Sequence, residues 1–178
     1  MNATIVRLSS RDGMVALDEL RPDRFELVAE WLSNAEINRW LTSEWRGRTV
    51  AASIIAMAVR NPRNRMFVVL YHDQPCGLAC LADIDLLDKS AMIWYFLGEP
   101  KLAGSGITSS AVRQLARFAF QEMGLGSLYA WVMEDNNRSQ RVLQKAGFAW
   151  AGRIRNASRS GERQVDRIYF DLLPDLGQ

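Results

Sequence analysis

The sequence contains few of the residues that hold metal ions, with one histidine and two cysteines in 178 residues. Cys76 and Cys80 stand four positions apart on one apolar stretch, where strand alternation predicts that both point to the same face. A single Cys-x-x-x-Cys pair with one distant histidine is not a zinc pattern. We therefore expect no metal, and we interpret both cysteines as small buried hydrophobic side chains.

Long hydrophobic runs are lacking as well. No window approaches the roughly 18 consecutive apolar residues of a membrane-spanning helix. Residues 1–10 do not contain the apolar run of a signal peptide. These absences predict a cytoplasmic protein without a membrane partner.

The sequence also lacks a large excess of either positive or negative charge. The 22 basic and 20 acidic residues give a net charge of +2, and the basic residues form no run. Nucleic acid is therefore not an expected partner, because such proteins usually cluster their basic residues. Hydrophobic residues make up 48% of the chain, which suffices for a core, and no linker or repeat interrupts it. We expect a single domain over residues 1–178.

The first third of the chain alternates short strands and helices. Strands are expected near residues 5–8 and 15–20, with Arg11-Asp12-Gly13 as the turn between them. A helix is expected to start at Arg21-Pro22-Asp23, and a short helical turn follows near 37–41. Thr49 is the expected N-cap of a further helix over 50–59, which ends before Asn61-Pro62.

The rest of the chain predicts a sheet with two more helices. Residues 66–71, 76–84 and 91–97 form an antiparallel meander, and an amphipathic helix follows over 108–123. A strand over 128–133 then pairs in parallel with 91–97. A helix over 137–146 and strands near 148–154 and 163–172 complete an α/β fold of the α+β kind. It has a mixed, mostly antiparallel twisted sheet of about seven strands with helices on both faces.

A glycine loop precedes the long helix, with the sequence Lys101-Leu102-Ala103-Gly104-Ser105-Gly106-Ile107. Glycines let the backbone approach an anion closely, and the N–H groups and dipole of the following helix favour phosphate. Thr108 can cap the helix or bind phosphate. A plain strand-to-helix turn is the structural alternative. A dinucleotide-binding loop fits less well because one glycine is missing, and a Walker loop is excluded because Gly-Lys-Ser/Thr is absent.

A second motif opens the helix expected at 137–146. It reads Asn136-Asn137-Arg138-Ser139-Gln140-Arg141-Val142-Leu143-Gln144-Lys145-Ala146-Gly147-Phe148. Asn136 and Ser139 can act as helix caps only, or they can contact a ligand as well. This helix can form the far wall of a cleft whose near wall is the glycine loop.

The two motifs together resemble those of the GNAT N-acetyltransferases, over roughly residues 76–172. The second motif and the Leu-Gly-Glu-Pro before the loop resemble the branch of ribosomal-protein N-terminal and spermidine acetyltransferases. The resemblance implies acetyl-CoA as co-substrate, with its pyrophosphate on the backbone of residues 102–108 and its pantetheine along the strand at 96–97. The implied cofactor-binding residues are Phe96, Leu97, Leu102, Ala103, Gly104, Ser105, Gly106, Ile107, Thr108, Asn136 and Ser139.

The resemblance also implies catalytic roles for Asn136, which would bind the pantetheine arm, and for Ser139. Because Leu143 occupies the place of the tyrosine that many relatives use, Ser139 is the candidate acid for the leaving thiolate. The family's two usual positions for a glutamate base fall on Ala91 or Met92 and on Trp131, which cannot take a proton. The alternatives are deprotonation through water and the nearby titratable side chains Asp83, Asp85, Glu99, Glu134 and His72, which we expect mostly at the surface.

The expected function is transfer of acetyl from acetyl-CoA to a primary amine of a small molecule or of a peptide N-terminus. Tryptophans at 31, 40, 45, 94 and 131 are mostly core candidates, but a cleft lined with them fits a sugar or a neutral amine better than a polyamine. Two alternatives stay open. One is acetylation of a nucleotide-linked amino sugar, and the other is a non-catalytic module that binds acyl-CoA. A monomer or a homodimer is expected.

Overall fold

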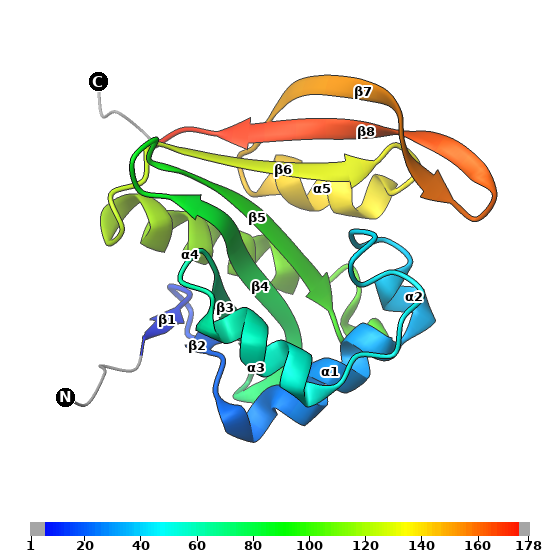
Figure 1. The fold of residues 1–178 in the computed structure, drawn as a ribbon. Helices are drawn as coiled ribbons and strands as arrows, with labels where there is room; N and C mark the ends of the chain where they lie inside the picture. Colours follow the sequence, from blue (N-terminus) through cyan, green and yellow to red (C-terminus); the bar gives the residue numbers. More distant parts are fainter. Residues whose placement is uncertain (1–5, 175–178) are drawn as a thin grey trace.

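The computed structural model describes residues 6–174, in which eight strands form one sheet with helices on both of its faces (Figure 1). The strand order is β1-β2-β3-β4-β5-β6-β8-β7, and every neighbouring pair is antiparallel except β5 and β6. The strands are β1 (Arg7–Ser9), β2 (Val15–Glu19), β3 (Arg65–Tyr71), β4 (Gln74–Asp85), β5 (Ser90–Leu97), β6 (Ser127–Met133), β7 (Ala149–Ser160) and β8 (Arg163–Leu172). The mixed, mostly antiparallel sheet is confirmed.

The helices divide between the two faces as predicted. On one face lie η1 (Pro22–Arg24), α1 (Phe25–Ser33), α2 (Ala35–Asn38) and α3 (Ala52–Arg60). After β5 the chain passes through the short turn η2 (Pro100–Leu102). On the other face lie α4 (Ile107–Gln121) and α5 (Asn137–Lys145). Two separate buried clusters result, one under each layer of helices. None of the helices in residues 6–174 is both long enough and apolar enough to span a membrane.

Strand alternation sends the residues of β5 to both clusters. Ile93 packs in the cluster beneath α4, whereas Phe96 packs in the cluster beneath α1. The central strand therefore presents different side chains to the two helical layers. The same alternation determines on which side of the sheet each β5 side chain can contribute to a site.

Strands β5 and β6 separate after a short parallel pairing. Only Ser90–Met92 pair with Ser127–Tyr129, so the second half of β5 does not pair with the second half of β6. Helix α4 makes the crossover between them, which confirms the predicted strand–helix–strand unit. The sheet consequently opens at its centre, beside the start of α5 (Figure 1).

Several local predictions need correction. Thr49 does not cap the third helix, because α3 begins at Ala52 with Ala51 as its N-cap and no side-chain cap bond. Cys76 and Cys80 do not share a face. The pairing of β3 with β4 shifts by one residue between Val69 and Leu70, so Cys76 lies opposite no residue of β3. Because of this bulge, Cys76 points into the cluster beneath α4, whereas Cys80 points into the cluster beneath α1. Both thiols are nevertheless buried and unpaired, as expected. The first predicted strand begins at Arg7, and Ile5 lies outside the described residues.

Candidate functional site

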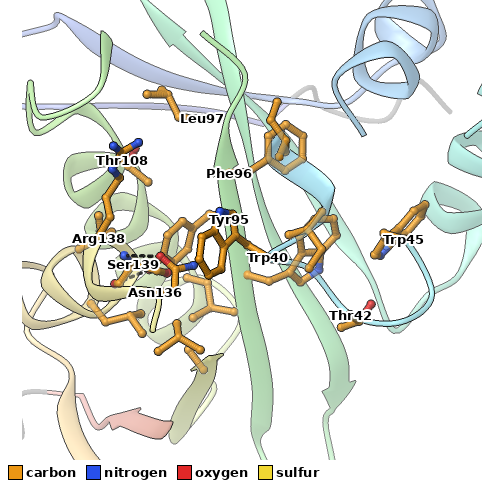
Figure 2. A pocket seen from close by; sticks show the side chains of 18 of the residues that line it. Trp40, Thr42, Trp45, Tyr95, Phe96, Leu97, Thr108, Asn136, Arg138 and Ser139 are labelled. Carbon is orange, nitrogen blue, oxygen red and sulfur yellow. Dashed lines mark hydrogen bonds between the residues drawn. The ribbon is translucent and has the colours of Figure 1, made fainter. Parts of the chain in front are cut away.

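A cleft of about 1480 Å³ lies where β5 and β6 separate. Its walls include residues 103–109, residues 135–145, the second half of β5 and the segment between α1 and α3. Side chains of α3, β4 and β6 also contribute. The two predicted motifs therefore face one cavity, although about 30 residues separate them in the sequence. Figure 2 shows Asn136 and Ser139 on one side of β5, and Trp40, Thr42 and Trp45 on the other.

The glycine loop supplies backbone donors to the cleft. Gly104 and Gly106 have positive φ angles of 88° and 84°, and a Cβ added at either would meet no atom within 4 Å. Glycine is thus required here by the backbone conformation and not by crowding. In this described stretch, the N–H groups of Gly104, Gly106, Ile107 and Thr108 have no acceptor in the protein. Four free donors at the start of a 15-residue helix form a suitable anion site.

Helix α5 supplies positive charge to the same wall. Arg138, Arg141 and Lys145 all line the cleft, because residues three and four apart share one face of a helix. Figure 2 shows Arg138 beside Thr108, at the start of α4. Sequence reasoning did not select these three cations, although their spacing within the second motif carried the signal. Together with the free N–H groups, they suit a ligand that carries several phosphates.

Asn136 and Ser139 occupy the first turn of α5. The side-chain Oδ1 of Asn136 accepts a hydrogen bond of 3.1 Å from the Ser139 backbone N–H, so the predicted N-cap is present. Both residues line the cleft as well. The cap therefore fixes the Ser139 backbone at the edge of the cleft, and the capping role and a ligand role are compatible.

Tyr95 is the important residue that the sequence analysis did not identify. Its hydroxyl donates to the Ser139 carbonyl oxygen at 3.0 Å and lies 2.9 Å from the Ser139 Oγ. Burial raises the pKa of the Tyr95 phenol well above its ordinary value, so the hydroxyl keeps its proton even in alkaline solution. The signal was indirect, since only the position of Tyr95 on the α5 side of β5 brings it to Ser139. Leu143, in the position of the family's usual tyrosine, is fully buried.

The candidate bases separate clearly in the structure. Asp83 lines the cleft, whereas Asp85 accepts hydrogen bonds from the backbone N–H groups of Leu87 and Asp88 in the following turn. Glu134 accepts from the backbone N–H of Asp166 at 3.2 Å. Neither Asp85 nor Glu134 lines the cleft.

Two further candidates also lie away from the cleft. Glu99 does not line it, and His72 is exposed in the β3–β4 turn. Asp135 lines the cleft but was not considered from the sequence, and it pairs with Arg163 at 3.5 Å.

Aromatic side chains line the other half of the cleft. Trp45, from the segment after α2, stacks on Trp94 of β5 with ring centroids 6.1 Å apart. Trp40 and Trp131 also line this half, whereas Trp31 is buried against Phe96 and does not line it. Four of the five tryptophans therefore border the cavity. Trp45 is nevertheless buried in the core, as expected, and Trp94 packs against the same buried cluster.

Arg46 connects the segment after α2 with the β7–β8 hairpin. One guanidinium nitrogen donates to the Leu41 carbonyl and the other to the Arg159 carbonyl in the β7–β8 hairpin, both at 2.7 Å. Burial, and to a lesser degree the charge of Arg167, lower the pKa of Arg46. The segment between α2 and α3 is thus connected to the hairpin by one side chain.

The comparison with known families agrees with this geometry. Residues 15–149 match the model of the acetyltransferase (GNAT) domain. The chain belongs to this GNAT family. The resemblance drawn from the two motifs is confirmed, and the family is one of acetyl-CoA-dependent acyltransferases.

Individual relatives of this GNAT chain are distant. A putative ribosomal N-acetyltransferase, YdaF of Bacillus subtilis, is 29% identical over 105 residues, which is 59% of the chain and 57% of that relative. The matched region thus spans little more than half of YdaF. A spermidine N(1)-acetyltransferase of Escherichia coli is 22% identical over 141 residues, covering 79% of the chain and 75% of the relative.

A solved structure shows the same fold. The ribosomal L7/L12 α-N-protein acetyltransferase RimL, crystallised with coenzyme A, superposes with a TM-score of 0.81 at 14% identity. The superposition covers 93% of this chain and 97% of RimL. At this identity the likeness shows the fold alone, and the predicted fold class is confirmed.

Proposed function

We propose that the chain transfers the acetyl group of acetyl-CoA to a primary amine of a small molecule or of a peptide N-terminus. One observation carries the proposal: a single cleft joins an anion-binding end to an aromatic end, and a pair of hydroxyl groups lies between them. The anion-binding end suits the phosphates of CoA, and the aromatic end is left for the acceptor. The two substrates would then meet beside Tyr95 and Ser139.

The phosphates of CoA would bind to the free N–H groups of residues 104–108 and to the cations of α5. Both sources of positive potential lie on one wall, so together they neutralise several negative charges. The second half of β5 pairs with β4 but not with β6, so its open edge near Phe96 and Leu97 can offer main-chain groups to the amide groups of pantetheine. This arrangement leads the thioester toward Ser139.

Ser139 would stabilise the thiolate that leaves when the amine attacks the thioester carbonyl. Tyr95 donates its own hydrogen to the Ser139 carbonyl, so the Ser139 hydroxyl is the member of the pair free to turn toward the sulfur. The Asn136 cap holds the Ser139 backbone in position, and Tyr95 contacts the hydroxyl itself. We assign Ser139 as the proton donor and Tyr95 as its positioning residue.

The attacking amine must lose a proton, and the cleft offers one candidate carboxylate from the sequence set. Asp83 lines the acceptor half, and no side-chain hydrogen bond occupies it in the described residues. Water in the open cleft is the other route. We propose that deprotonation uses Asp83 directly or through water, which needs no base on β6.

Two alternative functions remain. Acetylation of a nucleotide-linked amino sugar would use the same cofactor end with a different acceptor. A binding module without turnover is disfavoured by the ordered hydroxyl pair, because binding alone needs no proton donor at the thioester.

Calorimetric titration with acetyl-CoA, and with CoA in parallel, tests the cofactor end first. We expect micromolar binding of both ligands. Release of free thiol is then followed with amine acceptors, and the Ser139→Ala variant serves as reference. Absence of binding of either ligand would refute the proposal. Binding without thiol release for any amine would favour the non-catalytic module.

A further inference from the structure

The acceptor half of the cleft has a largely apolar wall. It combines side chains from the segment after α2, from α3, and from the central strands. The large apolar side chains in this wall are Trp40, Trp45, Ile54, Met57, Met92, Trp94 and Trp131. Alternation along β5 places Met92 and Trp94 on the face opposite Tyr95, so the wall lies across the strand from the hydroxyl pair.

Part of this wall is exposed to solvent. Met57 is 70% exposed and Ile54 is 44% exposed, although both belong to an amphipathic helix whose Ile55 is fully buried. Exposed apolar side chains scattered singly are ordinary, but here two of them border a cavity that is also lined by tryptophan. Apolar surface inside a cleft gains free energy when a ligand covers it.

The indole rings of the wall are held in place without a ligand. Trp45 stacks on Trp94, the Arg39 guanidinium lies 4.6 Å from the Trp40 ring centre, and the Arg167 guanidinium lies 4.1 Å from that of Trp131. A wall that is already ordered loses little conformational entropy on binding. It therefore favours a rigid apolar group.

The charges around the wall suit a monoamine better than a polyamine. Of the four carboxylates that line the cleft, Glu36 pairs with Arg39 at 3.6 Å and Asp135 with Arg163 at 3.5 Å. In the described part of the chain, Asp83 and Glu44 have no such partner. These two carboxylates are fewer than the three ammonium groups of a polyamine such as spermidine, whereas a single amine needs only one acidic neighbour.

We infer that the acceptor is a primary amine carried on an aromatic or large apolar group. The group would lie against Met57, Trp40 and Trp94, with the amine directed toward the hydroxyl pair. Such an acceptor exists as a free arylalkylamine or as a peptide whose first residue is large and apolar, and both have the same recognition chemistry. This inference rests on the proposed acetyltransferase function and specifies its acceptor.

The test measures kcat/KM by thiol release for matched acceptors. The free amines are 2-phenylethylamine, ethanolamine and spermidine, and the peptides differ only in an N-terminal Phe or Ser. We expect the better of 2-phenylethylamine and the Phe peptide to exceed its hydroxyl counterpart at least about tenfold, since apolar groups in such pockets discriminate on that scale. Comparison of the free-amine and peptide arms identifies the source.

Single substitutions test which side chain produces the preference for apolar acceptors. Met57→Gln keeps the length of the side chain but makes it polar, and we expect it to lower the apolar-to-hydroxyl ratio about threefold or more. Met14→Gln is the matched control, because Met14 is 42% exposed and does not line the cleft. It should leave the ratio unchanged.

The outcomes separate the inference from the proposed function. If ethanolamine, the Ser peptide or spermidine is used as well as the apolar acceptors, the inference is wrong and the acetyltransferase function stands. An unchanged ratio in Met57→Gln also overturns it. If acetyl-CoA binds but no amine releases thiol, the proposed function itself fails, and the inference fails with it.

Discussion

The two halves of the cleft are built in different ways. The half beside α4 and α5 combines backbone N–H groups, two left-handed glycines and a capped helix start with the cations of α5, all within residues 96–108 and 136–145. The aromatic half consists of side chains from α3, the segment before it, and strands β4, β5 and β6. The first half is defined by backbone conformation, which short motifs encode. The second half depends on which distant side chains the fold brings together.

This difference has a consequence for function. A backbone cradle binds phosphate in the same way whatever side chains surround it. A wall of side chains can change its shape and polarity by single substitutions without disturbing the cradle. The chain can thus share its family's cofactor end and still select its own acceptor.

The largest expected effect is on the hydroxyl pair between the two halves. Ser139→Ala removes the hydroxyl proposed to stabilise the leaving thiolate, and we expect kcat to fall about 100-fold or more. Acetyl-CoA affinity should change less than about threefold, because the backbone N–H that Asn136 caps is retained. Thiol release and calorimetry measure the two quantities.

Tyr95→Phe separates positioning from donation. It removes the hydrogen bonds to the Ser139 carbonyl and Oγ, so we expect a smaller loss of kcat, about tenfold. In the double variant the two losses should not add, since both act through one hydroxyl. Additive losses would show that Tyr95 acts independently, and an unaltered kcat in Ser139→Ala would refute the assignment of that residue.

The next effect concerns the cradle. Gly106→Ala places a Cβ on a residue with φ of 84°, and the left-handed conformation costs about 1–2 kcal/mol in a residue with a side chain. Relief of this strain would move the N–H groups at the start of α4, so acetyl-CoA affinity should fall about fivefold or more.

Gly161→Ala is the matched control for the cradle. Gly161 has φ of 61° in the β7–β8 turn, equally without neighbours within 4 Å, and it does not line the cleft. Both variants should lose similar stability in urea unfolding, but only Gly106→Ala should lose affinity. Equal affinity in the two variants would mean that the glycine loop is only a turn.

The sequence predicted the half that backbone conformation defines. The glycine loop, the Asn136 cap and the parallel β5–β6 unit all follow from local rules, and the structure contains each of them. The contact between Tyr95 and Ser139 joins residues 44 positions apart, so no local rule could predict it. Strand alternation predicted the face of β5 on which Tyr95 lies. It did not predict that β5 and β6 separate, which lets Tyr95 reach α5.

The errors also have local causes. The faces of Cys76 and Cys80 were wrong because a bulge adds one residue to β4, and alternation alone cannot locate a bulge. Thr49 satisfied the preference for an N-cap, but the chain remains extended to Ala51 before α3 begins. Among the tryptophans, Trp31 of α1 packs against Phe96 and does not line the cleft, whereas the equally buried Trp45 does, and that distinction requires the tertiary structure.

A smaller effect is expected on acceptor binding in the aromatic half of the cleft. Arg46→Ala removes both hydrogen bonds that connect Leu41 and the Arg159 carbonyl, and hydrogen bonds from charged donors contribute about 1.5–3 kcal/mol each where they are buried. These bonds are partly exposed, so we expect the acceptor KM to rise only about fivefold. The affinity for acetyl-CoA should not change.

Arg48→Ala is the control for that prediction. Arg48 is exposed, and only its backbone atoms have hydrogen-bond partners in the described residues: its N–H donates to the Trp45 carbonyl, and its carbonyl accepts from the Asn38 side chain. The variant retains both bonds. Both variants remove one positive charge near the cleft, so a general electrostatic effect would appear in both. A raised KM in Arg48→Ala as well would refute the role of the Arg46 connection.

The smallest effect is a pH dependence of stability. Because burial raises the pKa of Tyr95, the folded protein keeps the phenolic proton above pH 10, whereas the unfolded chain releases it. The unfolded state then binds fewer protons, so the free energy of unfolding falls as pH rises through that range. At pH 10.5 the loss should be about 1 kcal/mol relative to pH 8. Tyr95→Phe should lack this component, and the difference between the two urea-unfolding profiles isolates it from all other groups. Parallel profiles would mean that the Tyr95 hydroxyl is open to solvent, and that the boundary between the two halves of the cleft is less enclosed than its hydrogen bonds to Ser139 indicate.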